Sequence, residues 1–129
     1  VSGGIVSTAG ITPDTRYPWG QCTWWAATRR ADIGKPIPGW GNAATWAGSA
    51  ASAGYTVDGS PSAGSVIVFQ PGVLGASADY GHVAMVEEVR GDGSILISES
   101  NALGLGVVST REISASQLAA AGNGVRYIH

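Results

Sequence analysis

The sequence has few charged residues and few of the residues that bind metals or form disulfides. Charged residues make up 12% of the 129 residues, the formal net charge is -2 at pH 7, and no run of lysine or arginine occurs. This balance argues against nucleic acid or an anionic membrane surface as the partner, because both are bound through clustered basic residues. One cysteine forms no intramolecular disulfide, and together with two histidines it supplies no zinc site. The aspartates do not follow the spacing of a calcium-binding loop, so we predict no metal and no cofactor.

Long hydrophobic runs are also absent. No apolar stretch approaches the roughly 18 residues that cross a bilayer, so we expect no membrane insertion. The chain begins VSGGIVSTAG, which has neither an initial methionine nor the basic and apolar regions of a signal peptide. We therefore expect a monomeric domain of a larger protein, with residues 1–15 as a linker leading into it and residues 16–129 as the domain. A hydrophobic content of 44% is sufficient for one core.

The first half of the chain has the patterns of helices. Apolar residues at helical spacing predict a helix over residues 22–33, with Gly34 as its C-terminal stop. A second helix fits residues 43–53, with Asn42 as N-cap and Gly54 as the stop.

The second half has the patterns of strands. Short β-branched segments bounded by turn residues predict strands at residues 66–69, 83–89, 95–98, 107–113 and 125–128. Ser114 and Gln117 form a capping-box pattern, which predicts one short helix before the last strand. Helices followed by an antiparallel sheet make this an α+β domain.

Cys22 is the first residue whose position indicates chemistry. It falls at or just inside the N-terminus of the first predicted helix, where unpaired N–H groups and the helix dipole favour thiolate over thiol. A lowered pKa is what a nucleophilic cysteine requires. The alternative is a small buried hydrophobic residue, which is the commonest role of a lone cysteine. Catalysis would in addition require a base.

Two histidines are candidates for that base. His129 is the last residue, where precise positioning is difficult. His82 opens a strand directly after the glycine-rich segment 70–81, which we expect to line the site. An exposed histidine at a strand end is the alternative for His82.

The hairpin that follows His82 predicts which polar residues accompany it. If Asp92-Gly93 form a two-residue turn, Val86 opposes Glu99. The same face then carries His82 and Asn101, with Asn101 as the nearer, diagonal neighbour at about 7–8 Å and Glu99 one rung further. A three-residue Gly-Asp-Gly loop would instead place the histidine on the opposite face. Either polar residue can fix the tautomer and orientation of an imidazole base. The alternative for Glu99 is a solvated strand carboxylate with no such role, but burying a charge on a face beside isoleucines would be energetically costly.

Three blocks of sequence resemble the CHAP domain family, the cysteine, histidine-dependent amidohydrolase/peptidases. The blocks are YPWGQCTWWA at residues 17–26, GHVA at residues 81–84 and ESN at residues 99–101, with Pro61 and Gly64 before the VIVF strand. The resemblance extends from about Arg16 to Ile128. It implies a papain-like α+β fold that cleaves amide bonds in bacterial peptidoglycan.

Carried over by position, the resemblance makes Cys22 the nucleophile and His82 the general base. It implies that Glu99 orients the imidazole, whereas the hairpin register favours Asn101 as the nearer partner. Both residues are therefore kept as candidate catalytic residues, with Asn101 as a fourth polar member of the site.

Further candidates surround the nucleophile. The oxyanion requires preorganised donors; the nucleophile's own N–H is the first candidate, and Gln21 or Tyr17 is the second. Trp19 and Trp40 fall in predicted loops and Tyr80 falls in the glycine-rich segment, so we take all three as candidate substrate-binding residues. Core packing is the alternative for the tryptophans.

The resemblance implies a peptidoglycan hydrolase that is secreted, bound to the cell wall or carried in a phage particle. Its reaction would be that of an N-acetylmuramoyl-L-alanine amidase or a peptide endopeptidase, through a thioester intermediate. Two alternatives remain open: a small-molecule amidase of the same architecture, and a non-catalytic, Trp-rich module that binds the cell wall. An open groove would favour peptidoglycan and a closed pocket the small substrate, while a pure binder has no need of a thiol.

Overall fold

The computed structural model describes residues 5–129. Its helices are α1 (Cys22–Asp32), α2 (Trp46–Ser52) and α3 (Ala115–Ala121), and short 3-10 helices lie at Ala43–Thr45, Val73–Gly75 and Gly122–Gly124. Its strands are β1 (Val57–Asp58), β2 (Val66–Phe69), β3 (His82–Val89), β4 (Ile95–Ser100), β5 (Val108–Ile113) and β6 (Val125–Ile128).

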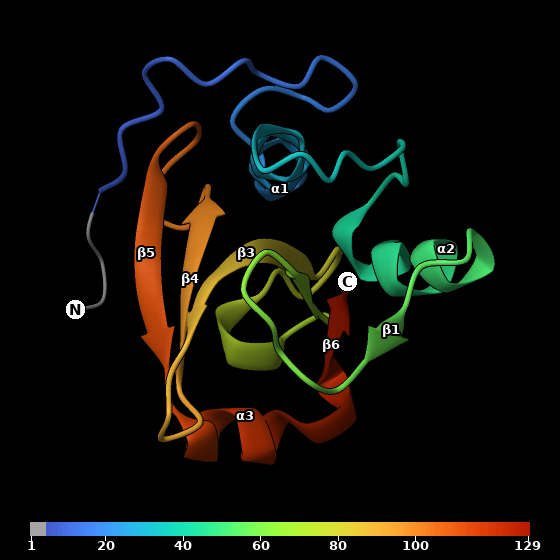
Figure 1. Cartoon of the computed structure of the whole chain (residues 1–129), viewed down its shortest axis with the longest axis vertical. Helices are drawn as coiled ribbons and strands as arrows, with labels where there is room; N and C mark the ends of the chain where they lie inside the picture. The colour runs from blue at the N-terminus through green and yellow to red at the C-terminus, as the bar shows by residue number, and fades with distance from the viewer. Residues whose placement is uncertain (1–4) are drawn as a thin grey trace.

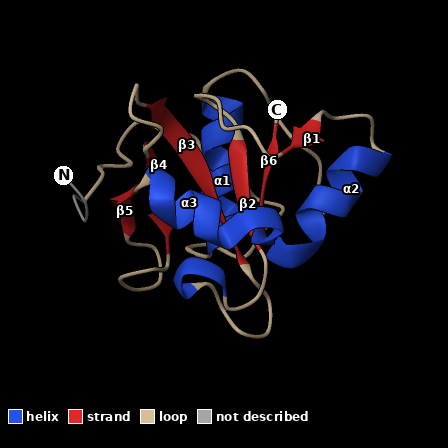
Figure 2. Cartoon of the chain, turned by 90° about the horizontal axis from the view of Figure 1, so that it is seen from below, coloured by secondary structure: helices blue, strands red, loops and turns tan. Residues whose placement is uncertain are grey.

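The strands form one six-stranded antiparallel sheet in the order β1-β6-β2-β3-β4-β5. Helices cover both of its faces (Figures 1 and 2): α1 and α2 pack on one face, and α3 packs on the other. In Figure 2 α3 lies in front of the strands and α1 behind them. The predicted α+β class is confirmed.

Alternation along β3 divides the core into two layers. Val83 and Met85 pack in the layer beneath α1, whereas Ala84 and Val86 pack in the layer beneath α3. β2 lies between β6 and β3, and all of its side chains are buried. This explains why its sequence, VIVF, is continuously apolar rather than alternating.

The predicted elements occur in the predicted order. β2 and β6 have the predicted bounds, and the Ser114–Gln117 capping box is present at the start of α3. The second helix differs from the prediction, because its first residues form a 3-10 turn and α2 starts only at Trp46. The Asn42 side chain makes no cap hydrogen bond. β1 was not predicted; it has two residues, too few for a periodic pattern.

The predicted two-residue turn between β3 and β4 is wrong. The Arg90 N–H donates to the Ser94 carbonyl at 2.9 Å, and the Gly93 N–H donates back to the Arg90 carbonyl at 3.0 Å. The loop therefore consists of residues 91–93, with Gly93 at a φ of 86°. Taken alone, this longer loop would move His82 to the opposite face of the sheet.

A β-bulge in β3 compensates for the longer loop and returns His82 to the face of the sheet that carries Glu99. The register of β3 against β4 shifts between Val86 and Glu88, so that Val86 opposes Ile97 and not Glu99 as predicted. The extra residue returns the alternation to its earlier phase. His82 and Glu99 consequently share a face, although neither the loop nor the pairing has the predicted register.

The segment before the predicted domain boundary contacts the domain. Residues 1–4 of the predicted linker lie outside the described residues. Further along, the Val6 N–H donates to the Val108 carbonyl at 2.8 Å, and the Asp14 N–H donates to the Thr28 hydroxyl at 2.9 Å. The boundary at residue 15 stays a prediction.

Candidate active site

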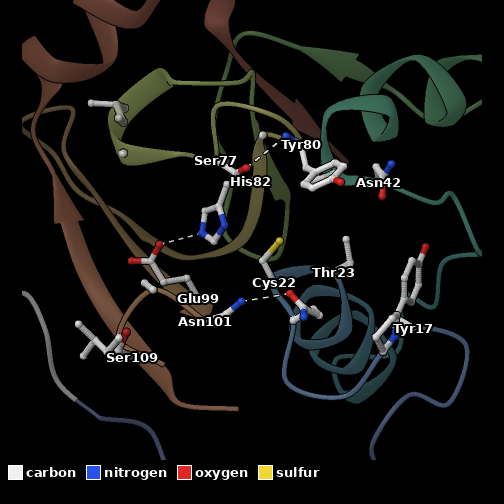
Figure 3. Close-up of a pocket in the computed structure, with 18 of the residues that line it drawn as sticks. Tyr17, Cys22, Thr23, Asn42, Ser77, Tyr80, His82, Glu99, Asn101 and Ser109 are labelled. Carbon is white, nitrogen blue, oxygen red and sulfur yellow. Dashed lines mark hydrogen bonds and ion pairs between the residues drawn. The ribbon is translucent and has the colours of Figure 1, made fainter. Parts of the chain in front are cut away.

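The N-terminus of α1 brings Cys22 opposite His82, the first residue of β3 (Figure 3). The turn before the helix is tied to the far side of the site, because the Gly20 carbonyl accepts from the Ser100 hydroxyl at 2.8 Å and from the Gly106 N–H at 3.1 Å. Gly20 has a φ of 83°, and a Cβ there would lie 2.7 Å from the Gly106 nitrogen. Only glycine fits this close approach, which fixes where the cysteine helix begins.

A polar network attaches the same helix to the sheet. Arg29 of α1 donates to both carboxylate oxygens of Glu87, at 3.1 and 2.9 Å. The Ser98 hydroxyl donates to Glu87 at 2.6 Å and accepts from the indole N–H of the buried Trp25 at 2.9 Å. These contacts link α1 to β3 and β4. They therefore fix the helix that carries Cys22 relative to the strands that carry the rest of the site.

The environment of Cys22 favours its thiolate. Burial raises the pKa of the thiol, but the hydrogen bond and charge of His82 and the N–H groups of Val83 and Thr23 outweigh burial and bring it below the ordinary 9.0. Burial also disfavours the charged form of His82 and so by itself lowers the pKa of the imidazole. Hydrogen bonds and charges of Cys22 and Glu99 outweigh burial and raise this pKa to about 9. The pair is therefore stabilised as thiolate and imidazolium.

Glu99 is the partner of the imidazole. Its Oε1 lies 2.9 Å from Nε2 of His82, which leaves Nδ1 for Cys22. Glu99 is only 3% exposed. Burial raises the pKa of its carboxyl, but His82 and Arg111 outweigh burial and keep it below the ordinary 4.5. The hairpin argument, which favoured Asn101 as the nearer partner, is wrong because β4 ends at Ser100 and Asn101, with a φ of 64°, leaves the strand and binds Gln21 instead.

Arg111 of β5 is a site residue that sequence reasoning missed. Its Nε and Nη2 lie 3.0 Å from the two carboxylate oxygens of Glu99. The available signal was the strand pattern, because Arg111 opposes Ile97 and therefore faces an apolar layer where an arginine is unexpected.

Asn101 and Gln21 contact each other rather than the imidazole. The side-chain amide of Asn101 donates to Oε1 of Gln21 at 3.1 Å (Figure 3), and Asn101 has a φ of 64°. Tyr17 does not fit the second oxyanion donor that we expected. Its hydroxyl donates to the Pro38 carbonyl at 3.0 Å and accepts from the Trp40 N–H at 2.7 Å, so its proton is already in use.

These residues line an open cleft of about 960 Å³. Cys22, His82 and Glu99 lie along it, and Tyr80, which is 60% exposed, forms part of its wall (Figure 3). The substrate-binding role of Tyr80 stays a prediction. Leu74 and Leu103 are among the apolar residues that also line the cleft. The form is that of a groove rather than a closed pocket.

The two candidate tryptophans lie elsewhere. Trp19 is 61% exposed and packs against Trp24, with ring centres 5.9 Å apart, but it is not among the described residues that line the cleft. Trp40 packs its ring against Trp46 and Tyr55. The prediction that Trp40 faces the groove is thus wrong, because the loop folds its indole back onto the core.

Within residues 5–129 no group of three or more histidine, cysteine, aspartate or glutamate side chains is arranged to hold a metal ion. No helix in the described part of the chain combines the length and apolarity needed to span a bilayer.

The family model of the CHAP domain matches residues 12–101. The chain belongs to the CHAP domain family. The match includes Cys22, His82 and Glu99, the residues that the structure brings together at the cleft.

Solved and curated relatives agree with this assignment. A crystal structure of an N-acetylmuramoyl-L-alanine amidase from Staphylococcus aureus superposes with a TM-score of 0.82 at 41% identity, covering 89% of this chain and 31% of that one. Among curated proteins of S. aureus, the N-acetylmuramoyl-L-alanine amidase sle1 is 44% identical over 88% of this chain and 31% of its own length. The probable autolysin SsaALP is 54% identical over 66% of this chain and 30% of its own length. The likeness confirms the papain-like CHAP fold, and the chain spans less than a third of each relative.

Proposed function

We propose that this CHAP domain is a cysteine hydrolase that cleaves an amide bond of bacterial peptidoglycan, as an N-acetylmuramoyl-L-alanine amidase. The hydrogen-bonded series of Cys22, His82 and Glu99 along an open cleft is the observation that carries the proposal. The names of the relatives, two amidases and a probable autolysin, favour the bond between sugar and stem peptide.

In the first half of the proposed reaction, the Cys22 thiolate attacks the carbonyl carbon of the amide. The resulting oxyanion accepts hydrogen bonds from free N–H groups at the start of α1, first of all from that of Cys22 itself. The His82 imidazolium then gives its Nδ1 proton to the amine nitrogen. The C–N bond breaks, the amine leaves, and a thioester remains on the sulfur.

In the second half, neutral His82 takes a proton from water and the hydroxide attacks the thioester carbon. The C–S bond breaks, which releases the carboxylic acid and restores the thiolate beside the imidazolium. Glu99 accepts the Nε2–H of His82 throughout, and this holds the ring in the tautomer whose Nδ1 can act as the base.

Gln21 and Asn101 are proposed to act at the oxyanion end of the cleft. The Asn101 amide binds the carbonyl oxygen of the Gln21 side chain, so the N–H₂ group of Gln21 is the part left to donate to an oxyanion. Tyr80 is proposed to contact the substrate along the groove. That the chain is one domain of a larger protein agrees with the short share of each relative that it spans. The domain is proposed to be monomeric and to act at the cell wall, outside the cell or in a phage particle.

The test is digestion of purified sacculi by the domain and by Cys22→Ala, with the released fragments identified by mass spectrometry. We expect fragments from the wild type alone, with the stem peptide separated from the sugar. Cuts within the peptide would replace the amidase with an endopeptidase. If both proteins bind sacculi and neither releases fragments, a wall-binding module is favoured; if neither binds nor cuts, a small amide becomes the better substrate.

A further inference from the structure

Arg111 contacts three parts of the site at once. Two nitrogens of its guanidinium contact Glu99, and the third, Nη1, donates to the carbonyl of Leu74 at 2.8 Å. The guanidinium carbon lies 5.6 Å from the centre of the Phe69 ring, and the same ring lies 5.5 Å from the His82 ring. The guanidinium is thus held by the carboxylate, the cleft wall and the aromatic ring that packs against the imidazole.

The charge of Glu99 depends on its cationic neighbours. Burial of a carboxyl that is 3% exposed favours the neutral acid. The charged groups that contact it are His82 from β3 and Arg111 from β5, while the Cys22 thiol of α1 lies across the imidazole. In the proposed reaction His82 transfers its proton to the leaving amine. From that point Arg111 is the cation that remains in contact with Glu99.

The protonation state of Glu99 decides whether His82 can act as a base for water. An ionised carboxylate accepts the Nε2–H and leaves Nδ1 free to receive a proton. A protonated Glu99 would instead donate to Nε2, which moves the ring proton to Nδ1 and removes the base. Keeping this carboxylate ionised is therefore a requirement of the second half of the reaction.

The third contact of Arg111 reaches the wall of the cleft. Leu74 lines the cleft and has a φ of 50° and a ψ of 38°, a conformation that a non-glycine residue adopts at a cost. The hydrogen bond from Arg111 to the Leu74 carbonyl stabilises this segment. The same side chain consequently fixes Glu99 and one wall of the groove.

We propose that Arg111 is a positioning residue of the reaction: it keeps Glu99 ionised and directed at His82, and it aligns the cleft wall at Leu74 with them. The proposal rests on the catalytic roles proposed above for Cys22 and His82. Its distinguishing consequence is electrostatic. Loss of the cation makes every proton of the coupled thiol, imidazole and carboxyl harder to remove, whereas a merely structural arginine would lower activity without moving the pH profile.

The test measures alkylation of Cys22 by iodoacetamide as a function of pH. Cys22 is the one cysteine of the chain, so the reaction reports on it alone and needs no peptidoglycan. The variants are Arg111→Gln, which keeps a donor but removes the charge, and Arg111→Lys, which keeps the charge. Arg126→Gln is the matched control, because Arg126 also lies in the sheet but hydrogen-bonds the exposed Asn123.

We expect the alkylation midpoint of Arg111→Gln to move to higher pH, with about three- to tenfold slower alkylation on the acid side of the midpoint. Arg111→Lys and Arg126→Gln should keep the wild-type midpoint, and Arg111→Lys should hydrolyse sacculi more slowly because it loses the two-pronged contact with Glu99. An unmoved midpoint in Arg111→Gln, or an equal shift in Arg126→Gln, would overturn the proposal.

If circular dichroism shows that Arg111→Gln is unfolded, Arg111→Met, which keeps an unbranched stem and removes the charge, takes its place. An upward shift of its alkylation midpoint supports the proposal, and an unmoved midpoint contradicts it. A wild-type midpoint at the value of an ordinary thiol is a different result. It would refute the proposed function itself, because no stabilised thiolate would then exist for Arg111 to support.

Discussion

Gly81, the residue before His82, offers a sharp test of how the backbone places the imidazole. It has a φ of 72°, and a Cβ there would lie 2.5 Å from the Phe69 carbonyl oxygen and 3.1 Å from Cβ of Ala44. Gly72 is the matched control, since its φ is 79° and its Cβ would meet nothing within 4 Å. Alanine at either position incurs a backbone cost of about 1 kcal/mol. At Gly81 alone, the backbone must also move, at a further cost of about 1–3 kcal/mol.

The comparison is made by thermal unfolding of Gly81→Ala and Gly72→Ala. For a domain of this size 1 kcal/mol corresponds to about 4 °C in Tm, so we expect Tm to fall by about 4 °C in Gly72→Ala and by about 8–16 °C in Gly81→Ala. The displaced Phe69 carbonyl belongs to the residue that opposes His82 in the sheet. Gly81→Ala should therefore also slow alkylation of Cys22 below its unfolding temperature. Equal Tm values and equal alkylation rates for the two variants would refute the reasoning.

Further predictions concern pH and the attachment of α1. Hydrolysis should rise with pH as the Cys22 thiolate forms and fall again near the pKa of His82, about 9, as the imidazolium proton is lost, which a kcat/KM profile measures. Because the pKa of His82 is raised from 6.5 to about 9 in the folded domain, protonated His82 should stabilise the fold. This contribution to the free energy of unfolding should be fully present below pH 6.5 and lost as the pH rises through about 9. Denaturant titrations at several pH values test this. Glu87→Ala should destabilise the domain by about 1–2 kcal/mol, since Arg29 loses its two-pronged partner, whereas Glu88→Ala, at a site 58% exposed, should cost less than about 0.5 kcal/mol in the same titrations.

The order of elements could be predicted because each left a local pattern. The helix at Cys22, the buried VIVF strand and the capping box at Ser114 each depend on residues close in sequence. The face shared by His82 and Glu99 was predicted for an incorrect reason. A longer loop and a bulge between Val86 and Glu88 compensate for each other, and neither has a residue pattern that distinguishes it from a regular hairpin.

The remainder of the site depends on contacts between distant segments. Arg111 meets Glu99 only through the pairing of β5 with β4, which hydrophobic patterns do not specify to the residue. In the sequence, Trp40 could not be distinguished from a tryptophan that lines a groove, because both would lie in a loop. Only tertiary packing directs its indole onto Trp46 and Tyr55. The catalytic roles of the three central residues stay predictions, supported by their geometry.

The central claim is that Cys22 and His82 form a thiolate–imidazolium pair. Ultraviolet absorbance of the thiolate, followed through a pH titration of the wild type, His82→Ala and the control His129→Ala, tests it directly. We predict that the thiolate of the wild type and of His129→Ala persists below the pKa of an ordinary thiol, and that His82→Ala shifts the midpoint upward, because the largest contribution that lowers the pKa of Cys22 is then gone. A midpoint that is the same in all three proteins would contradict the account.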